Sequence, residues 1–390
     1  MTRPPVRLAF LMTHPVQYAA PLFRRIAREP DIDLTVLYQT DLSAGAFHDP
    51  GFGRTITWDV PLLDGYRSEF LPSWGEKDRI DLWQPFPRNL ARRLTRRHFD
   101  HVLIHGYSRP AHILAMLAAR LGGVRVLIRD EATPISKRRG PLNRLLKRLF
   151  FAGIGRLVDG VMAIGRLNGD YYRQNGFARP RIHPMPYAVD NDFFRRDVGD
   201  AGASLRRRLG IPADAPVILY ASKMQARKHP DHLLEAFLHL RQRSLAVPAH
   251  LVMVGDGELQ PRIRAMAAGA ADIHLEGFRG QQELIAYYDM CDVFVLPSSG
   301  EPWGLVVNEA MNRAKAIIVS DQVGSGPDLV RSGDNGFIFP AGHIAALTDA
   351  LEQTCRDRAQ AQAMGQRSLE IISGWDFEAD IRGLRQALGI

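Results

Sequence analysis

Residues 293–310 read VFVLPSSGEPWGLVVNEA, and this stretch decides the fold. It begins with an unbroken apolar run, passes through a turn rich in proline, serine and glycine, and becomes apolar again near Gly304. A short apolar strand, a turn and a helix form the repeating unit of a parallel sheet covered by helices. The first N–H groups of such a helix have no partner within the helix and can bind an anion. The stretch therefore predicts a strand and a helix whose connecting loop faces a ligand.

The same alternation of strand and helix extends through both halves of the chain. Strands are expected at Val6–Met12, Leu34–Tyr38, His101–His105, Val124–Arg129, Gly160–Ile164, Val217–Ala221, His250–Val254, Ile273–Glu276, Val293–Leu296, Ala316–Ser320 and Gly336–Phe339. Because these runs are apolar without alternation, both faces of each sheet should be buried, as in a parallel, doubly wound α/β fold. A chain of 390 residues with 46% hydrophobic and 24% charged residues fits two soluble domains.

A proline-rich segment, residues 180–216, interrupts the alternation and has the composition of a linker. We therefore expect two Rossmann-like domains, residues 1–195 and 196–375, facing each other across a cleft, followed by a helix at 376–390. Sheets of this kind bind ligands beyond the carboxyl ends of their strands, so the cleft is the expected site.

The sequence also limits where the protein works. The apolar run Leu8–Met12 is too short for a signal peptide or a membrane span, which needs about 20 apolar residues. Cys291 and Cys355 lack the spacing of a metal site or a CxxC pair, which is typical of reduced thiols. These features predict a cytoplasmic protein.

Basic residues give the chain a net charge of +8 and gather in its first half. The two clusters are Arg88, Arg92, Arg93, Arg96 and Arg97, and Lys137, Arg138, Arg139, Arg144, Lys147 and Arg148. No interleaved aromatic platform or nucleic-acid module accompanies them, so we expect no nucleic-acid partner. Two interpretations remain: a basic amphipathic helix on anionic lipid, or a solvated basic face.

Charged residues follow two strands of the second half. Glu301 lies in the turn quoted above, and Glu309 lies about one and a half turns into the following helix. Lys223 and Lys228 follow the strand at 217–221, where the crevice of such a sheet opens. Fixed cations and helix N–H groups stabilise charge that develops on a leaving diphosphate. Solvated loop charges are the plainer alternative for each residue.

Together these residues resemble glycosyltransferase family 4, retaining enzymes of the GT-B fold, of the type that builds bacterial polysaccharides and glycans. Glu301 and Glu309 match the family's pair of glutamates, and the resemblance spans nearly the whole chain. Further similar segments are Tyr220–Asp231, Val254–Gly257, Leu275–Gly277, Val323–Gly324 and Tyr187–Phe194.

The resemblance implies roles for the second domain, which would bind the sugar-nucleotide donor. Lys223 and Lys228 would bind the diphosphate, although lysine at 223 replaces an arginine and loses its bidentate fork. Glu309 would bind the nucleotide ribose, and Glu301 would approach the transferred sugar. Backbone N–H groups around Gly304, Leu305 and Val306 would help to hold the donor.

The same resemblance implies that the first domain binds the acceptor and that the C-terminal helix packs back toward it. His14 and Gln17 follow the first strand, where the family usually has a glycine-rich loop. His105 matches a family histidine, and we expect it to be catalytic. Glu131 stands where the family often has a histidine near the reacting sugar, and we expect it to orient or deprotonate an acceptor hydroxyl.

The resulting prediction is a retaining glycosyltransferase that moves a hexose-type sugar from a nucleotide-diphosphate sugar to a glycan or lipid-linked acceptor. We expect no metal and no cofactor, and peripheral contact with anionic membrane. One alternative is a sugar-nucleotide epimerase of the same architecture. The other is a non-catalytic GT-B binding subunit.

Overall fold

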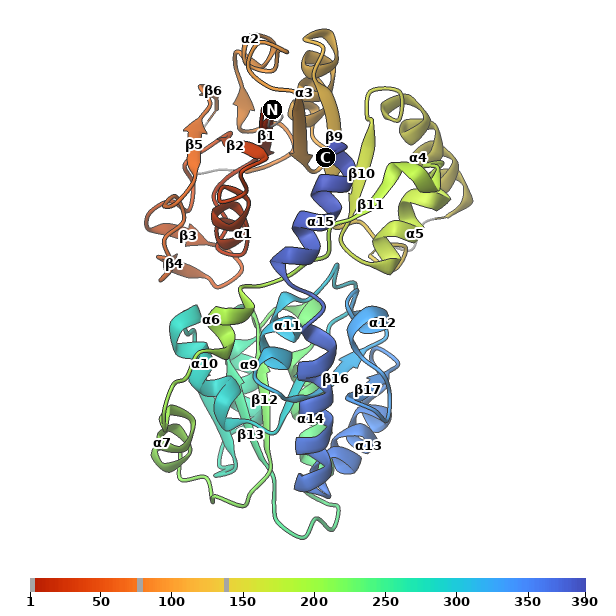
Figure 1. Ribbon diagram of the computed structural model, residues 1–390. Helices are drawn as coiled ribbons and strands as arrows, with labels where there is room; N and C mark the ends of the chain where they lie inside the picture. Colours follow the sequence, from red (N-terminus) through yellow and green to blue (C-terminus); the bar gives the residue numbers. More distant parts are fainter. Residues whose placement is uncertain (1–3, 76–79, 137–139) are drawn as a thin grey trace. The chain divides into compact units, whose positions relative to one another are not determined.

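The computed structural model describes residues 4–75, 80–136 and 140–390, which divide into two units (Figure 1). The first unit comprises residues 1–47, 56–189 and 377–390. The second unit comprises residues 190–376 together with the short segment 48–55. The helix at the C-terminus therefore belongs to the first unit, and a piece of the N-terminal half belongs to the second.

The first unit is built on a seven-stranded parallel sheet in the order β11-β10-β9-β8-β1-β2-β5. Its strands are β1 Val6–Met12, β2 Ile32–Tyr38, β5 Arg67–Phe70, β8 His101–His105, β9 Arg125–Arg129, β10 Gly160–Ala163 and β11 Ile182–Pro184. Its helices are α1 Ala19–Ile26, α2 Leu90–Arg93, α3 Pro110–Leu121, α4 Pro141–Ile154, α5 Arg166–Gln174 and α15 Phe377–Leu388. A two-stranded sheet in the first unit pairs β6 Ser73–Trp74 with β7 Phe86–Pro87, and another pairs β3 Phe47–Asp49 with β4 Arg54–Ile56, most of which lies in segment 48–55 of the second unit.

Each face of this sheet carries its own hydrophobic core. Leu11 and Val102 pack with Phe151 of α4 on one face. On the other face, Phe10 packs with Phe23 of α1 and Leu384 of α15. The unbroken apolar strands are explained by this burial on both sides.

The second unit repeats the plan with a six-stranded parallel sheet in the order β14-β13-β12-β15-β16-β17. Its strands are β12 Val217–Ala221, β13 His250–Val254, β14 Ile273–Gly277, β15 Val293–Leu296, β16 Ala316–Ser320 and β17 Gly336–Phe339. Its helices are α6 Asn191–Arg195, α7 Ala201–Arg208, α8 Pro230–Leu240, α9 Gln260–Met266, α10 Gln281–Met290, α11 Leu305–Asn312, α12 Gly326–Leu329, α13 Ile344–Cys355 and α14 Arg358–Ile372. The predicted α/β class with two doubly wound parallel sheets is confirmed.

Two segments differ in detail from the expectations. Residues 180–216 contain β11, α6 and α7, and the division between the two units, after Val189, falls within them. Pro184 is compatible with β11 because this strand lies at the edge of its sheet, where one side needs no N–H donor. The basic cluster at 88–97 does not form an amphipathic helix, since α2 spans only Leu90–Arg93.

Other expectations concern thiols and membranes. Cys291 and Cys355 are buried and unpaired, and burial raises the pKa of each thiol to about 12. Within the described ranges, every helix is too short or too polar to cross a bilayer. Lys137, Arg138 and Arg139 lie outside the described residues.

Candidate active site

The loop between β15 and α11 is held in one conformation by glycine. Gly304 adopts φ +92°, a left-handed conformation that favours glycine, and directly precedes α11. A Cβ at this position would lie 2.8 Å from Cδ2 of Leu296, the last residue of β15. The chain therefore turns sharply before α11. Leu305 and Val306, whose N–H groups were predicted to help hold the donor, lie in the first turn of this helix, where N–H groups can bind an anion.

A second segment, which follows β16, supports this loop through backbone contacts. The N–H of Glu301 donates to the carbonyl of Gln322 at 3.0 Å, and the N–H of Gly324 donates to the carbonyl of Glu301 at 3.0 Å. Trp303 is buried, and its Nε1 donates to Oδ1 of Asn308 at 2.9 Å. These contacts fix the position of Glu301.

Glu301 forms a buried ion pair with Lys228. The Nζ of Lys228 donates to Oε2 of Glu301, and the Arg227 guanidinium donates to the same oxygen at 2.8 Å. Burial alone would raise the pKa of Glu301, but Lys228 and Arg227 outweigh it and hold this pKa below its ordinary value. Burial lowers the pKa of Lys228, and the negative charge of Glu301 opposes that shift. The structure thus brings together two residues that were predicted separately from the sequence.

Glu309 lies in the second turn of α11 and is only 1% exposed. Its Oε2 accepts a hydrogen bond from the Tyr288 hydroxyl at 2.6 Å. Neither Tyr288 nor Arg227 was singled out from the sequence. The sequence signal that could have identified Arg227 is its position next to Lys228 in the segment Tyr220–Asp231. Tyr288 has no such signal, because it looks like an ordinary core aromatic residue of α10.

Lys223, the other predicted diphosphate ligand, is paired with a carboxylate of segment 48–55. Its Nζ lies 2.8 and 2.9 Å from the two carboxylate oxygens of Asp49, and it also lies 4.6 Å above the ring of Phe52. Phe52 in turn packs against Phe278, and Arg54 pairs with Asp256 at 3.1 Å. The segment therefore anchors on the second unit and places a negative charge where the donor's phosphates are expected.

Replacing Asp49 by asparagine should tighten the binding of a nucleoside diphosphate by about three- to tenfold, because Lys223 would no longer be neutralised by a carboxylate. Isothermal titration with UDP and GDP measures this. Arg54→Gln is the matched comparison, since it weakens the anchoring of the same segment without freeing Lys223. If both variants bind the nucleoside diphosphate equally more tightly, the anchoring of segment 48–55, and not the charge of Asp49, controls access of the nucleotide to Lys223.

The first-domain residues predicted to bind the acceptor (His14 and Gln17) or to be catalytic (His105 and Glu131) lie at the carboxyl ends of neighbouring strands of the first sheet. His14 and Gln17 follow β1, His105 ends β8, and Glu131 follows β9. These three strands are neighbours in the sheet, and their carboxyl ends share an edge. Glu131 accepts a hydrogen bond from the Tyr187 hydroxyl at 2.5 Å.

The two histidines of this edge are uncharged at neutral pH. Burial, assisted by the charge of Arg109, lowers the pKa of His14 to about 4. Burial, assisted mainly by Arg129, lowers the pKa of His105 to about 3. A pKa this low makes His105 a weak general base and favours a hydrogen-bonding role for it.

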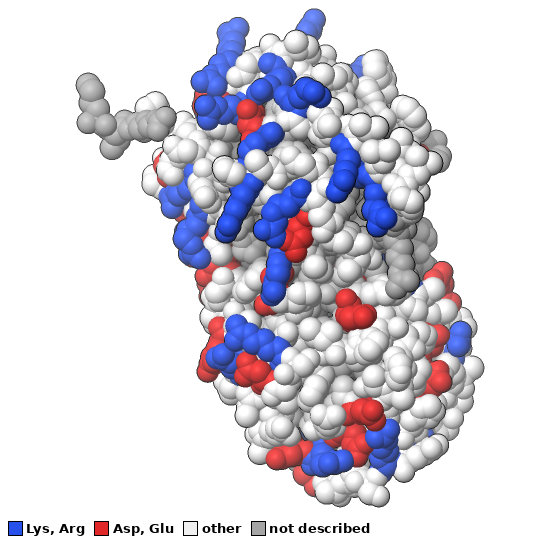
Figure 2. Space-filling view, turned by 90° about the vertical axis from the view of Figure 1, so that its right-hand side faces the viewer, with Lys and Arg blue, Asp and Glu red and all other residues white. Residues whose placement is uncertain are grey.

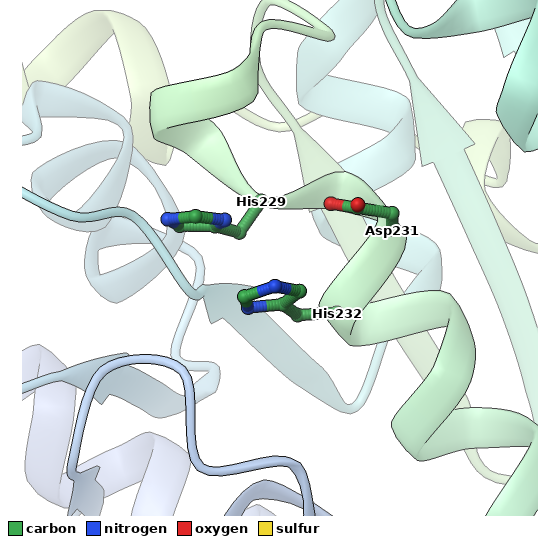
Figure 3. A group of neighbouring side chains, drawn as sticks. All are labelled: His229, Asp231 and His232. Carbon is green, nitrogen blue, oxygen red and sulfur yellow. The ribbon is translucent and has the colours of Figure 1, made fainter.

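Among the described residues, one group of potential metal ligands lies close together, namely His229, Asp231 and His232 (Figure 3). The two imidazole rings are stacked, with centroids 4.2 Å apart and planes inclined by 14°. Ring nitrogens bind a metal through lone pairs in the ring plane, so two nearly parallel rings do not direct them at one ion about 2.0 Å away. The Nε2 of His229 also lies 2.9 Å from Oγ of Ser299. This arrangement does not have the geometry of a metal site.

Comparisons with known proteins point to one class of enzyme. Residues 203–370 match the family model described as Glycosyl transferases group 1. A GDP-mannose-dependent alpha-(1-6)-phosphatidylinositol monomannoside mannosyltransferase of Mycolicibacterium smegmatis is 29% identical over 317 residues, covering 78% of this chain and 80% of that protein. A D-inositol 3-phosphate glycosyltransferase of Xylanimonas cellulosilytica is 32% identical over 225 residues, covering 54% of this chain and 52% of that protein.

Solved structures agree on the fold. HepE of Anabaena, in complex with UDP and glucose, superposes with a TM-score of 0.72 at 17% identity, covering 99% of this chain and 100% of that chain. Sucrose-phosphate synthase of Thermosynechococcus elongatus superposes with a TM-score of 0.70 at 19% identity, covering 98% of each chain. The resemblance seen in the sequence is thereby confirmed: residues 203–370 match the model of group 1 glycosyltransferases, the relatives found are glycosyltransferases, and the chain has the GT-B fold.

Proposed function

We propose that this enzyme transfers a hexose-type sugar from a nucleotide-diphosphate sugar to a glycan or lipid-linked acceptor, with retention at the anomeric carbon. The observation that carries the proposal is the buried pair of Lys228 and Glu301 beside the first turn of α11. Burial lowers the pKa of Lys228, and the negative charge of Glu301 opposes this shift and so favours the charged amine. A positioned, desolvated cation next to free helix N–H groups suits a diphosphate leaving group.

In the proposed reaction, the bond between the anomeric carbon and the diphosphate oxygen breaks, and the nucleoside diphosphate leaves with the electron pair. The acceptor hydroxyl forms the new bond on the same face of the sugar, and its proton passes to the departing phosphate. Lys228, Lys223 and the first N–H groups of α11 would neutralise the charge that grows on the diphosphate. We propose that these groups supply the charge that a metal ion would otherwise provide.

Thermal-shift measurements with UDP-, GDP- and ADP-sugars test the donor, because a ligand that binds the folded state raises the melting temperature. The anomeric coupling constant of the product then distinguishes retention from inversion. Release of an altered sugar nucleotide without any acceptor would instead support the epimerase alternative. Donor binding without transfer or hydrolysis across a broad acceptor screen would support a non-catalytic subunit.

We also propose that the enzyme works at the inner face of the cytoplasmic membrane, in contact with anionic lipid. The mannosyltransferase relative is named for a phosphatidylinositol acceptor, which is a lipid. Figure 2 views the side of the first unit that carries α4 and shows Lys and Arg gathered over that unit, with few acidic side chains among them. Such a surface attracts anionic headgroups.

Helix α4 adds an apolar stripe to this basic face. Four of its leucines are between 53% and 67% exposed, and their spacing places them on one side of the helix: Leu142, Leu145, Leu146 and Leu149. The opposite side buries Phe151 and Ile154 in the core. Arg144 and Arg148 of the same helix are also exposed and lie outside the stripe. An outward apolar stripe on a helix that also carries exposed cations has the composition of an interfacial helix.

Replacing Leu145 and Leu149 together by glutamate should abolish most flotation with vesicles that contain anionic lipid, because it removes the apolar stripe and adds repulsion. Asn143→Glu introduces negative charge on the same helix outside the stripe, and it should have only a small effect. Donor binding should be unchanged in both variants. Undiminished flotation of the double variant would contradict the membrane proposal.

A further inference from the structure

A buried arginine at the edge of the first sheet has only uncharged hydrogen-bond partners. Arg109 immediately precedes α3 and is 9% exposed. Its guanidinium donates to Thr13 Oγ1 at 3.2 Å and to the carbonyls of Gln84 and Pro85. Within the described part of the chain, no ion pair involves Arg109, and its Nε has no hydrogen-bond partner. A buried cation normally requires a compensating negative charge.

The acidic residue that acts on Arg109 does not meet this requirement. Asp81 raises the pKa of Arg109, but burial lowers it by more, so the net shift is downward. Oδ1 of Asp81 already accepts the backbone N–H groups of Trp83 and Gln84 at 2.8 and 3.0 Å. The positive charge of Arg109 is therefore left without a matching carboxylate.

Neutral polar side chains lie at the same end of the sheet as this cation. Burial, with a contribution from the charge of Arg109, lowers the pKa of both His14 and His112 to about 4. Gly106, at φ +100°, lets the His112 ring lie against the backbone, because a Cβ there would meet Cε1 of His112 at 2.7 Å. Gln39 follows β2, is 1% exposed, and donates its backbone N–H to the carbonyl of Thr13 at 3.1 Å. His14 and Gln39 follow the neighbouring strands β1 and β2, and His112 lies in the first turn of α3, the helix that follows β8.

Several polar atoms of this group lack partners. Both ring nitrogens of His112, Nδ1 of His14 and both amide atoms of Gln39 have no hydrogen-bond partner among the described residues. Buried polar atoms are rarely left in this state, and an exception calls for an explanation such as a ligand. Bracing of the loop at Gln84 and Pro85 explains two contacts of Arg109, but it explains neither the unmatched charge nor the unpartnered atoms.

We propose that Arg109, His14, His112 and Gln39 form a subsite for an oxyanion of the acceptor, a phosphate or carboxylate group on the sugar that is extended. A guanidinium offers paired N–H groups that match either oxyanion. Neutral imidazoles and a carboxamide supply further donors without repelling the cation. The inference rests on the proposed transferase function and narrows its acceptor to an anionic one.

The test uses the full-length chain without donor, labelled with carbon-13 at histidine. Inorganic phosphate and sodium glucuronate are titrated separately, with methyl glucoside as the uncharged comparison, and the Cε1–H resonances of His14 and His112 are followed. We expect saturable shifts with phosphate, with glucuronate or with both, and none with methyl glucoside. The anion that binds more tightly shows whether the oxyanion of the acceptor is a phosphate or a carboxylate.

Two variants and a control make the result specific. Arg109→Gln should weaken anion binding about tenfold or more. Arg120→Gln, on the exposed end of the same helix and paired with Asp159, should leave it unchanged. Gln39→Glu adds a carboxylate to the proposed subsite, so it should also weaken anion binding about tenfold.

The outcomes separate this inference from the proposed function. The subsite is refuted if neither anion shifts the two histidines saturably, or if a folded Arg109→Gln variant binds the anions as tightly as the native chain. Transfer to an anionic acceptor that is unaffected by Arg109→Gln would also refute it while supporting the transferase. Saturable anion binding in an enzyme that transfers to no acceptor would refute the proposed function and leave the subsite intact.

Discussion

Replacing Lys228 by methionine should lower the transfer rate about a hundredfold or more, because it removes a preorganised charge from the leaving diphosphate. Methionine retains the length and much of the volume of the lysine side chain. Glu301 keeps Arg227 as a charged partner at 2.8 Å, so the substitution does not leave a buried carboxylate without a cation. The melting temperature should therefore fall by only a few degrees while transfer is nearly lost.

Binding measurements can assign this loss to the diphosphate. The native enzyme should prefer the nucleoside diphosphate over the nucleoside, and Lys228→Met should reduce that preference about tenfold or more. Arg227→Gln is the matched control. Arg227 contacts the same oxygen of Glu301, but its side chain is 48% exposed, and solvent should reduce its contribution. A Lys228→Met variant that binds the diphosphate normally would show that Lys228 only supports Glu301.

The strands of both sheets were predictable because local sequence determines them. Val293–Leu296 and Ala316–Ser320 are short runs of apolar residues that end at polar or turn-forming residues, and the structure places strands at the same bounds. Burial on both faces removes the need for polar residues within such a strand. The signal is therefore strong, and it needs no knowledge of the rest of the fold.

Contacts over long sequence distances were not predictable in the same way. Segment 48–55 carries no hydrophobic period that would assign it to the second unit, yet Asp49 meets Lys223 there. The stripe on α4 shows the same limit. Leucines at helical spacing usually face a core, and only the fold shows that Leu145 and Leu149 face outward.

The candidate site was predictable to an intermediate degree. Glu301 and Lys228 were found separately, from the turn after one strand and the loop after another, and neither pattern implies a direct contact between them. The pairing of Tyr288 with Glu309 joins α10 to α11 and depends on how these two helices pack. Sequence motifs thus identified the charged residues of the site, whereas their partners depended on tertiary packing.

The position of Glu301 depends on the absence of a side chain at residue 324. A Cβ built on Gly324 would lie 1.8 Å from the carbonyl oxygen of Pro302 and 3.2 Å from that of Glu301. Both obstacles are backbone atoms of the loop, so no side-chain rotation can relieve the clash. The N–H of Gly324 also donates to the carbonyl of Glu301 at 3.0 Å, and a displaced loop would lose this hydrogen bond.

Gly324→Ala should therefore lower the free energy of unfolding by about 3 kcal/mol and weaken donor binding at the same time. Overpacking against backbone forces the loop at 301–303 to shift, and this shift moves Glu301 away from Lys228. Gly326→Ala is the matched control two residues away, since its Cβ would meet Cγ2 of Val319 at an ordinary 3.5 Å. Urea unfolding and nucleotide titration of both variants measure the two effects. The clash concerns the loop that holds Glu301. If the Gly324→Ala enzyme kept native stability and native donor affinity, the site would not depend on this loop as a rigid support.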